Sequence, residues 1–95
     1  MKVLPESINE LKKTRMFSKD SAPEQLQKDH KTASGIWGLI TIVSGSLEYV
    51  IVGDSTYTLS PEIPGVIEPE QVHYLRLEEP VEFYLTFYKN DNAIA

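Results

Sequence analysis

The sequence contains no cysteine, and its apolar runs are far shorter than the roughly 18 residues that a membrane-spanning helix needs. The missing thiols exclude a disulfide framework and thiolate metal sites, and they fit a reducing compartment. The first residues, MKVLPESINEL, lack the apolar core of a secretory signal. We therefore expect a cytoplasmic protein that makes no contact with a membrane.

Positive charge is scarce over most of the chain. Residues 38–95 contain two Lys or Arg against nine Asp or Glu, whereas residues 1–37 contain seven against five, within a net charge of −5. A phosphate backbone requires a basic surface, so this balance argues against nucleic acid as a partner. The 95 residues suffice for one domain, and a core this small favours stabilisation by a second copy. A homodimer is therefore expected.

Helical patterning is weak, and short strand-like segments alternate with turn residues. Segment 5–14 fits either a short helix or an extended arm. Segment 35–43, GIWGLITIV, is apolar on both faces, which predicts a strand buried on both sides, and the SGS at 44–46 predicts a hairpin turn after it. Strands are expected over 25–31, 35–43, 47–52, 56–60, 71–77 and 81–89. Their spacing predicts an all-β antiparallel sandwich or small barrel.

Motifs of catalysis are missing. The sequence has no Cys nucleophile, no G-x-S-x-G turn, no phosphate-binding glycine loop and no H-E-x-x-H. These absences do not decide whether the protein is an enzyme, but they favour a protein that is not one.

His73 is the leading candidate for a functional residue. In the predicted strand QVHYLRL, alternation places His73 on the same face as Leu75 and Leu77, which should point inward. A buried imidazole is costly unless its nitrogens find partners. A metal, a ligand or a carboxylate would serve, and so would a hydrogen bond within the core, which would make His73 a purely structural residue.

The second histidine, His30, suggests a metal site. Two imidazoles from separate strands are a common beginning of such a site, and a carboxylate often completes it. Glu70 and Glu68, in the turn before His73, are candidates for that third ligand, and Glu48 is a weaker one. The candidate metal ligands are therefore His30, His73 and, as the least certain, Glu70.

Several blocks of the sequence resemble one family. GVIEPEQVH, a Gly-x-x-x-Pro-x-x-x-His run entering a strand, resembles the second conserved motif of the cupin superfamily, and GLITIVSGSLEYVIV resembles the end of the first. From about Pro5 to Lys89 the order of the blocks is similar to that of the small TehB/YeaR-like cupins, that is, the N-terminal domain of tellurite-resistance protein B. Two departures stand out. The His-x-His pair of the first motif is missing, and Gly38 stands where its glutamate would be.

The resemblance implies a fold and a set of site residues. The fold would be a single cupin-like domain over 1–95, a double-stranded β-helix or jelly-roll barrel of antiparallel strands. Its parts would be an N-terminal arm (1–24), the barrel (25–89) and a flexible tail (90–95). The ligand-binding residues that match the family pattern are His73, His30, Thr32 and Trp37.

The resemblance also implies a function. A small cupin would bind a divalent metal (Zn, Ni, Mn or Fe), a small anion or another small molecule at the barrel mouth, in an oxyanion or stress response. In some relatives such a domain precedes a tellurite-resistance methyltransferase, so a methyltransferase is a candidate partner. Two alternatives stay open: a structural or assembly domain without a ligand, and a metal-dependent oxygenase or isomerase.

Overall fold

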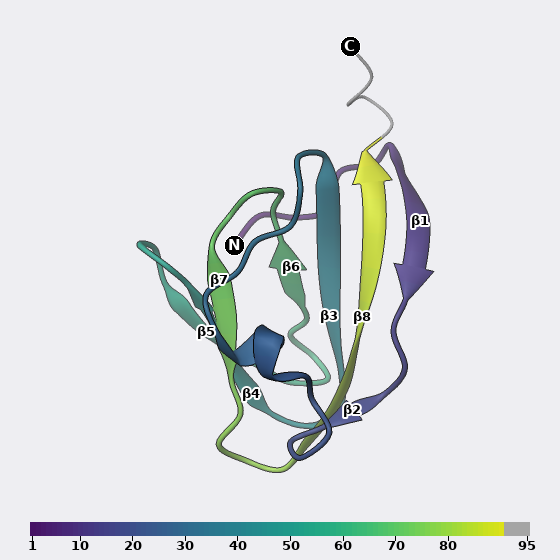
Figure 1. The fold of residues 1–95 in the computed structure, drawn as a ribbon. Coiled ribbons are helices and arrows are strands. Elements are labelled where there is room, and N and C mark those ends of the chain that lie inside the picture. The colour runs from purple at the N-terminus through teal and green to yellow at the C-terminus, as the bar shows by residue number, and fades with distance from the viewer. Residues whose placement is uncertain (91–95) are drawn as a thin grey trace.

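The structure is a computed structural model that describes residues 1–90. It consists of eight β-strands and one short 3-10 helix, η1 (Figure 1). The elements are β1 (Ile8–Lys13), β2 (Phe17–Ser18), η1 (Glu24–Gln27), β3 (Ile36–Gly45), β4 (Leu47–Ile51), β5 (Thr56–Leu59), β6 (Gly65–Ile67), β7 (His73–Arg76) and β8 (Val81–Asn90). Over residues 1–90, no helix is long and apolar enough to cross a membrane.

The strands form two antiparallel sheets. The larger sheet has the order β1-β8-β3-β6, with β2 also paired to β8, and the smaller sheet has the order β5-β4-β7. The expectation of an all-β antiparallel fold is confirmed. Within residues 1–90 no strand pairing joins the two sheets into a closed barrel, so the double-stranded β-helix of the cupins is not confirmed.

The core lies between the two sheets. Alternate residues of each strand point inward, as the period of two in a strand requires. Tyr49 is fully buried, and its hydroxyl crosses from the smaller sheet to donate a hydrogen bond to the Val66 carbonyl on β6 (2.8 Å). The buried hydrophobic residues are Phe17, Ile40, Ile42, Leu47, Tyr49, Ile51, Leu59, Ile67, Leu75, Leu77, Val81, Phe83 and Leu85.

The predicted hairpin turn at 44–46 is wrong. β3 and β4 belong to different sheets, so the chain crosses from one sheet to the other at this point. Gly45 has φ +78°, and a Cβ there would lie 2.1 Å from the Pro80 carbonyl oxygen. The glycine is needed because its φ lies in the left-handed region and because the start of β8, which pairs with the end of β3, occupies the space of a Cβ.

Three other expectations are corrected or resolved. Segment 35–43 is not buried on both sides: Val43 is 45% exposed, because this sheet has one face toward the core and one toward solvent. Segment 25–31 is not a strand, since η1 occupies part of it and only His30 pairs with a strand. Of the two alternatives for 5–14, the extended one holds, because β1 pairs with β8.

The structure describes the segment expected as an N-terminal arm and only the first residue of the segment expected as a tail. Residues 1–24 contribute β1 and β2 to the larger sheet. Asn90 is the last residue of β8, and residues 91–95 of the predicted tail lie outside the described residues.

Candidate functional site: a histidine pair between the sheets

His73 is the first residue of β7, and its side chain is only 1% exposed. It faces the interior together with Leu75, as the alternation of the sequence predicted. Its Nδ1 lies 2.8 Å from the carbonyl oxygen of Gln71. A carbonyl oxygen only accepts hydrogen bonds, so Nδ1 carries the hydrogen and donates it.

His30 lies directly beside His73. The segment that follows η1 runs along the outer edge of β7, where the backbone N–H of each histidine donates to the carbonyl oxygen of the other, at 3.0 and 2.9 Å. The two ring centroids are 4.4 Å apart and the rings are tilted by 55°. The two histidines are therefore brought together at one place, as the metal hypothesis required.

Both rings hold the same tautomer. His30 Nδ1 lies 3.2 Å from the Lys28 carbonyl oxygen, so it also carries a hydrogen. In the neutral rings each Nε2 then keeps a free lone pair, and a backbone carbonyl on the other nitrogen is a frequent arrangement for a metal-binding histidine. Burial lowers the pKa of His73 and a charge on His30 lowers it further, whereas the Gln71 carbonyl raises it. The net lowering keeps His73 neutral near pH 7.

The space beside the two rings is small and apolar. It is a cavity of about 10 Å³, about the volume that one water molecule or ion needs. Its floor comes from both sheets, and Leu26 of η1 covers it; besides the two histidines, the lining residues are Leu26, Ile40, Ile67, Leu75, Leu85 and Phe87. Tyr49 packs edge-on against His73 with its ring centroid 5.8 Å away.

The remaining predicted residues lie around the pair without joining it. Thr32 donates a hydrogen bond from its hydroxyl to the Ile36 carbonyl (2.9 Å), which holds the loop before β3. Trp37 pairs with Tyr88 on the outer face of the larger sheet, opposite to the cavity. Glu70 has φ +62° and an exposed side chain, and its backbone N–H donates to the Thr32 carbonyl.

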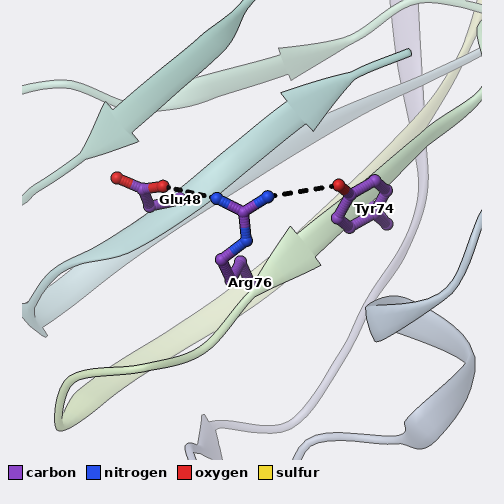
Figure 2. Close-up of polar contacts among 3 residues, drawn as sticks. All are labelled: Glu48, Tyr74 and Arg76. Carbon is purple, nitrogen blue, oxygen red and sulfur yellow. Dashed lines mark hydrogen bonds and ion pairs between the residues drawn. The ribbon is translucent and has the colours of Figure 1, made fainter.

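The carboxylates do not complete a metal site in the described part of the chain. Glu68 lies 3.6 Å from the Lys2 ammonium. Glu48 is on the outer face of the smaller sheet, where Arg76 donates to it (3.0 Å) and also to the Tyr74 hydroxyl (3.3 Å), as Figure 2 shows. Among residues 1–90 no group of three or more His, Asp or Glu side chains could hold a metal ion together.

Sequence reasoning missed the residues that shape the cavity. Tyr49, Leu26 and Phe87 come from three different elements, and nothing in their local patterns indicates contact with a histidine. The local signals are that Tyr49 and Phe87 each lie on the apolar face of a strand.

Comparison with known proteins identifies related chains. The family described as the TehB-like domain matches residues 12–85. Two curated proteins from Haemophilus influenzae, strains ATCC 51907 and 10810, are 30% identical over 85 residues; each is called a probable S-adenosyl-L-methionine-dependent methyltransferase TehB. The match covers 81% of this chain but only 29% of those relatives, so the chain spans less than a third of their length.

Two solved structures share the fold. The crystal structure of TehB from Haemophilus influenzae superimposes with a TM-score of 0.83 at 24% identity, over 90% of this chain and 32% of that one. A structural-genomics target from Escherichia coli K12 superimposes with a TM-score of 0.86 at 17% identity, over 95% and 98% of the two chains. The fold therefore occurs both as part of a longer chain and as nearly the whole of one.

Proposed function

The chain belongs to the TehB-like domain family, and on that premise we propose that it is a small binding module that holds a metal ion or small ligand at the His30–His73 pair. One observation carries the proposal. The two imidazole rings lie with their centroids 4.4 Å apart at the β7 edge, and the Nδ1 hydrogen bond of each ring leaves its Nε2 as the ligand atom. The glycine–proline–histidine spacing at 65–73 and the two facing sheets support a place for this family among the cupins.

A divalent metal ion suits the pair better than a bulky molecule. The cavity of about 10 Å³ has room for an ion or a water molecule and for nothing larger, unless η1 moves away. Among Zn, Ni, Mn and Fe, the imidazole ligand favours Zn, Ni and Fe, whereas Mn prefers oxygen ligands. Two nitrogen ligands leave the remaining positions to water or to an anion, which the cavity can admit only if η1 moves away.

The proposed biological setting follows from the relatives. An ion held by neutral imidazoles keeps its full positive charge and attracts small oxyanions. The Haemophilus relatives carry the name of a probable methyltransferase, and most of their length lies outside the matched segment. We propose that this chain acts in an oxyanion or tellurite stress response, in the cytoplasm, with a methyltransferase as its partner.

Titration calorimetry and thermal melting at pH 7.5 with Zn²⁺ or Ni²⁺ test the site. We expect about one ion per chain and a melting temperature that rises with metal concentration. His30→Ala should weaken binding by about tenfold or more, because it removes one ligand while His73 stays in the core. Glu48→Gln is the matched control, because it removes an exposed carboxylate on the opposite face of the smaller sheet.

Two outcomes contradict the proposal. One is a wild-type chain that takes up no metal, and the other is a His30→Ala variant that binds as tightly as the wild type. Either result would favour the structural alternative, in which the histidine pair serves only to close the edge of β7.

A further inference from the structure

Four stretches of sheet edge limit the two sheets in residues 1–90, and three of them are closed. On the edge formed by β1 and β2, Lys12 and Lys13 add charge, a register shift interrupts β1, and β2 has two residues. On β6, the Val66 N–H donates to the Met1 sulfur (3.0 Å) and the Val66 carbonyl accepts from Tyr49. These are recognised ways to prevent edge-to-edge pairing.

The two edges of the smaller sheet differ from each other. The edge of β7 is closed by His30, which exchanges two backbone hydrogen bonds with His73, and η1 packs against the same strand. On the edge of β5, no residue within 1–90 pairs with the outward backbone groups, although the Met1 amino group donates to the Tyr57 hydroxyl (2.7 Å). β5 is TYTL, which has no charged residue, no proline and no bulge.

The pairing register shows which backbone groups of β5 are open. The Ile51 N–H donates to the Ser55 carbonyl, and Tyr49 pairs with Tyr57. Because the N–H and C=O of successive residues point to opposite sides of a strand, Thr56 and Thr58 direct theirs away from β4.

Ser60 confirms this alternation. It lies two residues beyond Thr58, and on the outer side of the strand it exchanges two hydrogen bonds with Ile63, at 3.2 and 2.9 Å. That short bridge ends the open edge, so an added strand meets Thr56 and Thr58 only.

We propose that β5 of one chain pairs antiparallel with β5 of a second copy across a two-fold axis, which joins two three-stranded sheets into one of six strands. The strand is self-complementary in this register. Thr56 faces Thr58 of the other copy and Thr58 faces its Thr56, each pair exchanging two backbone hydrogen bonds. Tyr57 faces its own copy at the axis. Thr–Thr and aromatic pairs are favourable neighbours across strands.

The surroundings of β5 also fit a second copy. Ile63, 50% exposed, lies at the outer edge of the strand, and Val52, 40% exposed, precedes the turn that leads into it, so both add apolar surface to the contact. Asp54 and Glu62 flank the strand in each copy, and the chain carries a net charge of −5. Salt screens this repulsion, so the association is expected to strengthen as NaCl is added.

Sedimentation velocity over a wide concentration range tests the pairing. A short ladder forms a small interface, so we expect a weak dimer whose population rises between about 10 µM and about 1 mM. Thr58→Pro should weaken the association by about tenfold or more, because it removes an outward N–H without removing a hydrogen bond to β4. Thr58→Val is the matched control and should associate like the wild type, since it keeps the backbone N–H and a β-branched side chain.

Hydrogen exchange of the unmodified chain gives a second test that does not depend on a variant. The amides of Thr56 and Thr58 should exchange quickly in dilute protein and more slowly at high concentration. The proposal is overturned by a chain that stays monomeric at about 1 mM, as it would if the edge awaits a strand of another protein. It is equally overturned by a dimer that Thr58→Pro leaves intact, or by exchange at Thr56 and Thr58 that does not depend on concentration.

Discussion

Each edge of the smaller sheet has backbone N–H and C=O groups that no strand of the sheet pairs with, and the two edges differ in what satisfies them. At β7, a segment from a distant part of the sequence supplies His30, whose backbone pairs with His73 and whose ring packs beside the His73 ring. At β5, the backbone groups of Thr56 and Thr58 face outward, and no residue within 1–90 pairs with them. One edge is completed within the chain, and the other is free to bind an added strand.

The difference has consequences for function. Closing the β7 edge buries the His73 imidazole in an apolar cavity, so a positive charge on that ring lowers the stability of the fold. The same arrangement leaves ring nitrogens free for a ligand. The β5 edge carries threonines whose side chains are exposed, so their replacement changes little inside the monomer. Ligand binding and self-association are therefore expected at opposite edges of one sheet, with β4 between them.

The largest expected effect is on stability, and it separates the two edges directly. His73→Ala should lower the free energy of unfolding by about 2–4 kcal/mol, because it opens a cavity in the core and removes the ring that packs against His30. Thr58→Ala should lower it by about 0.5 kcal/mol or less, because the side chain is exposed on an edge strand. Urea denaturation of both variants in dilute protein measures the difference. Equal losses at the two positions would show that the β7 edge is not the better packed one.

Strand alternation predicted the inward position of His73, because Leu75 and Leu77 follow it at a spacing of two and the signal is local. Its contact with His30 is a different matter. That contact depends on where η1 and the following segment lie, and no periodicity in the sequence fixes their position. The metal hypothesis named both histidines because imidazoles are common metal ligands, not because the sequence indicated that they are in contact. Glu70, which it named as the third ligand, has an exposed side chain.

The crossover at Gly45 shows why the topology was harder to predict than the strands. A Ser-Gly-Ser turn between two apolar segments is compatible with a hairpin and with a change of sheet. What distinguishes them is that β4 pairs with β5 and β7 instead of β3, and β7 lies far from β4 in the sequence. For the same reason the state of each sheet edge cannot be read from the strand itself, because it depends on what packs beside that strand.

The next effect is a dependence on pH that belongs to the closed edge alone. Burial holds the pKa of His73 in the folded chain below its ordinary value of 6.5, so the unfolded chain binds more protons below that pH. Stability is therefore fully present above about pH 6.5 and falls as the pH drops, by at most about 1.4 kcal/mol per pH unit for this one group. The ionisable groups that face His73 are His30 and the uncharged Tyr49.

Urea midpoints measured at pH 7.5 and 5.5 test this dependence, since most carboxylates keep their charge in that range. His73→Phe retains a ring without a titrating group and should remove most of the difference between the two midpoints. Thr58→Ala should retain the whole of it. A wild-type chain that is equally stable at both pH values would show that His73 is protonated as easily in the folded state as in the unfolded one.

The smallest expected effect concerns two tyrosines, one serving a closed edge and the other lying on the open strand. The Tyr49 hydroxyl is inside the sandwich and donates to the Val66 carbonyl at the edge of β6, so Tyr49→Phe should cost about 1 kcal/mol, the net value of one hydrogen bond. Tyr57 packs against it with ring centroids 6.5 Å apart, and its exposed hydroxyl accepts a hydrogen bond from the Met1 amino group. Tyr57→Phe should therefore change the free energy of unfolding by less than about 0.5 kcal/mol, because water can replace that partner. Urea denaturation of the two variants measures both losses of unfolding free energy. Equal losses would show that the Tyr49 hydroxyl contributes no more to stability inside the sandwich than the Tyr57 hydroxyl does at the open edge. The β6 edge would then be closed by its other contacts alone.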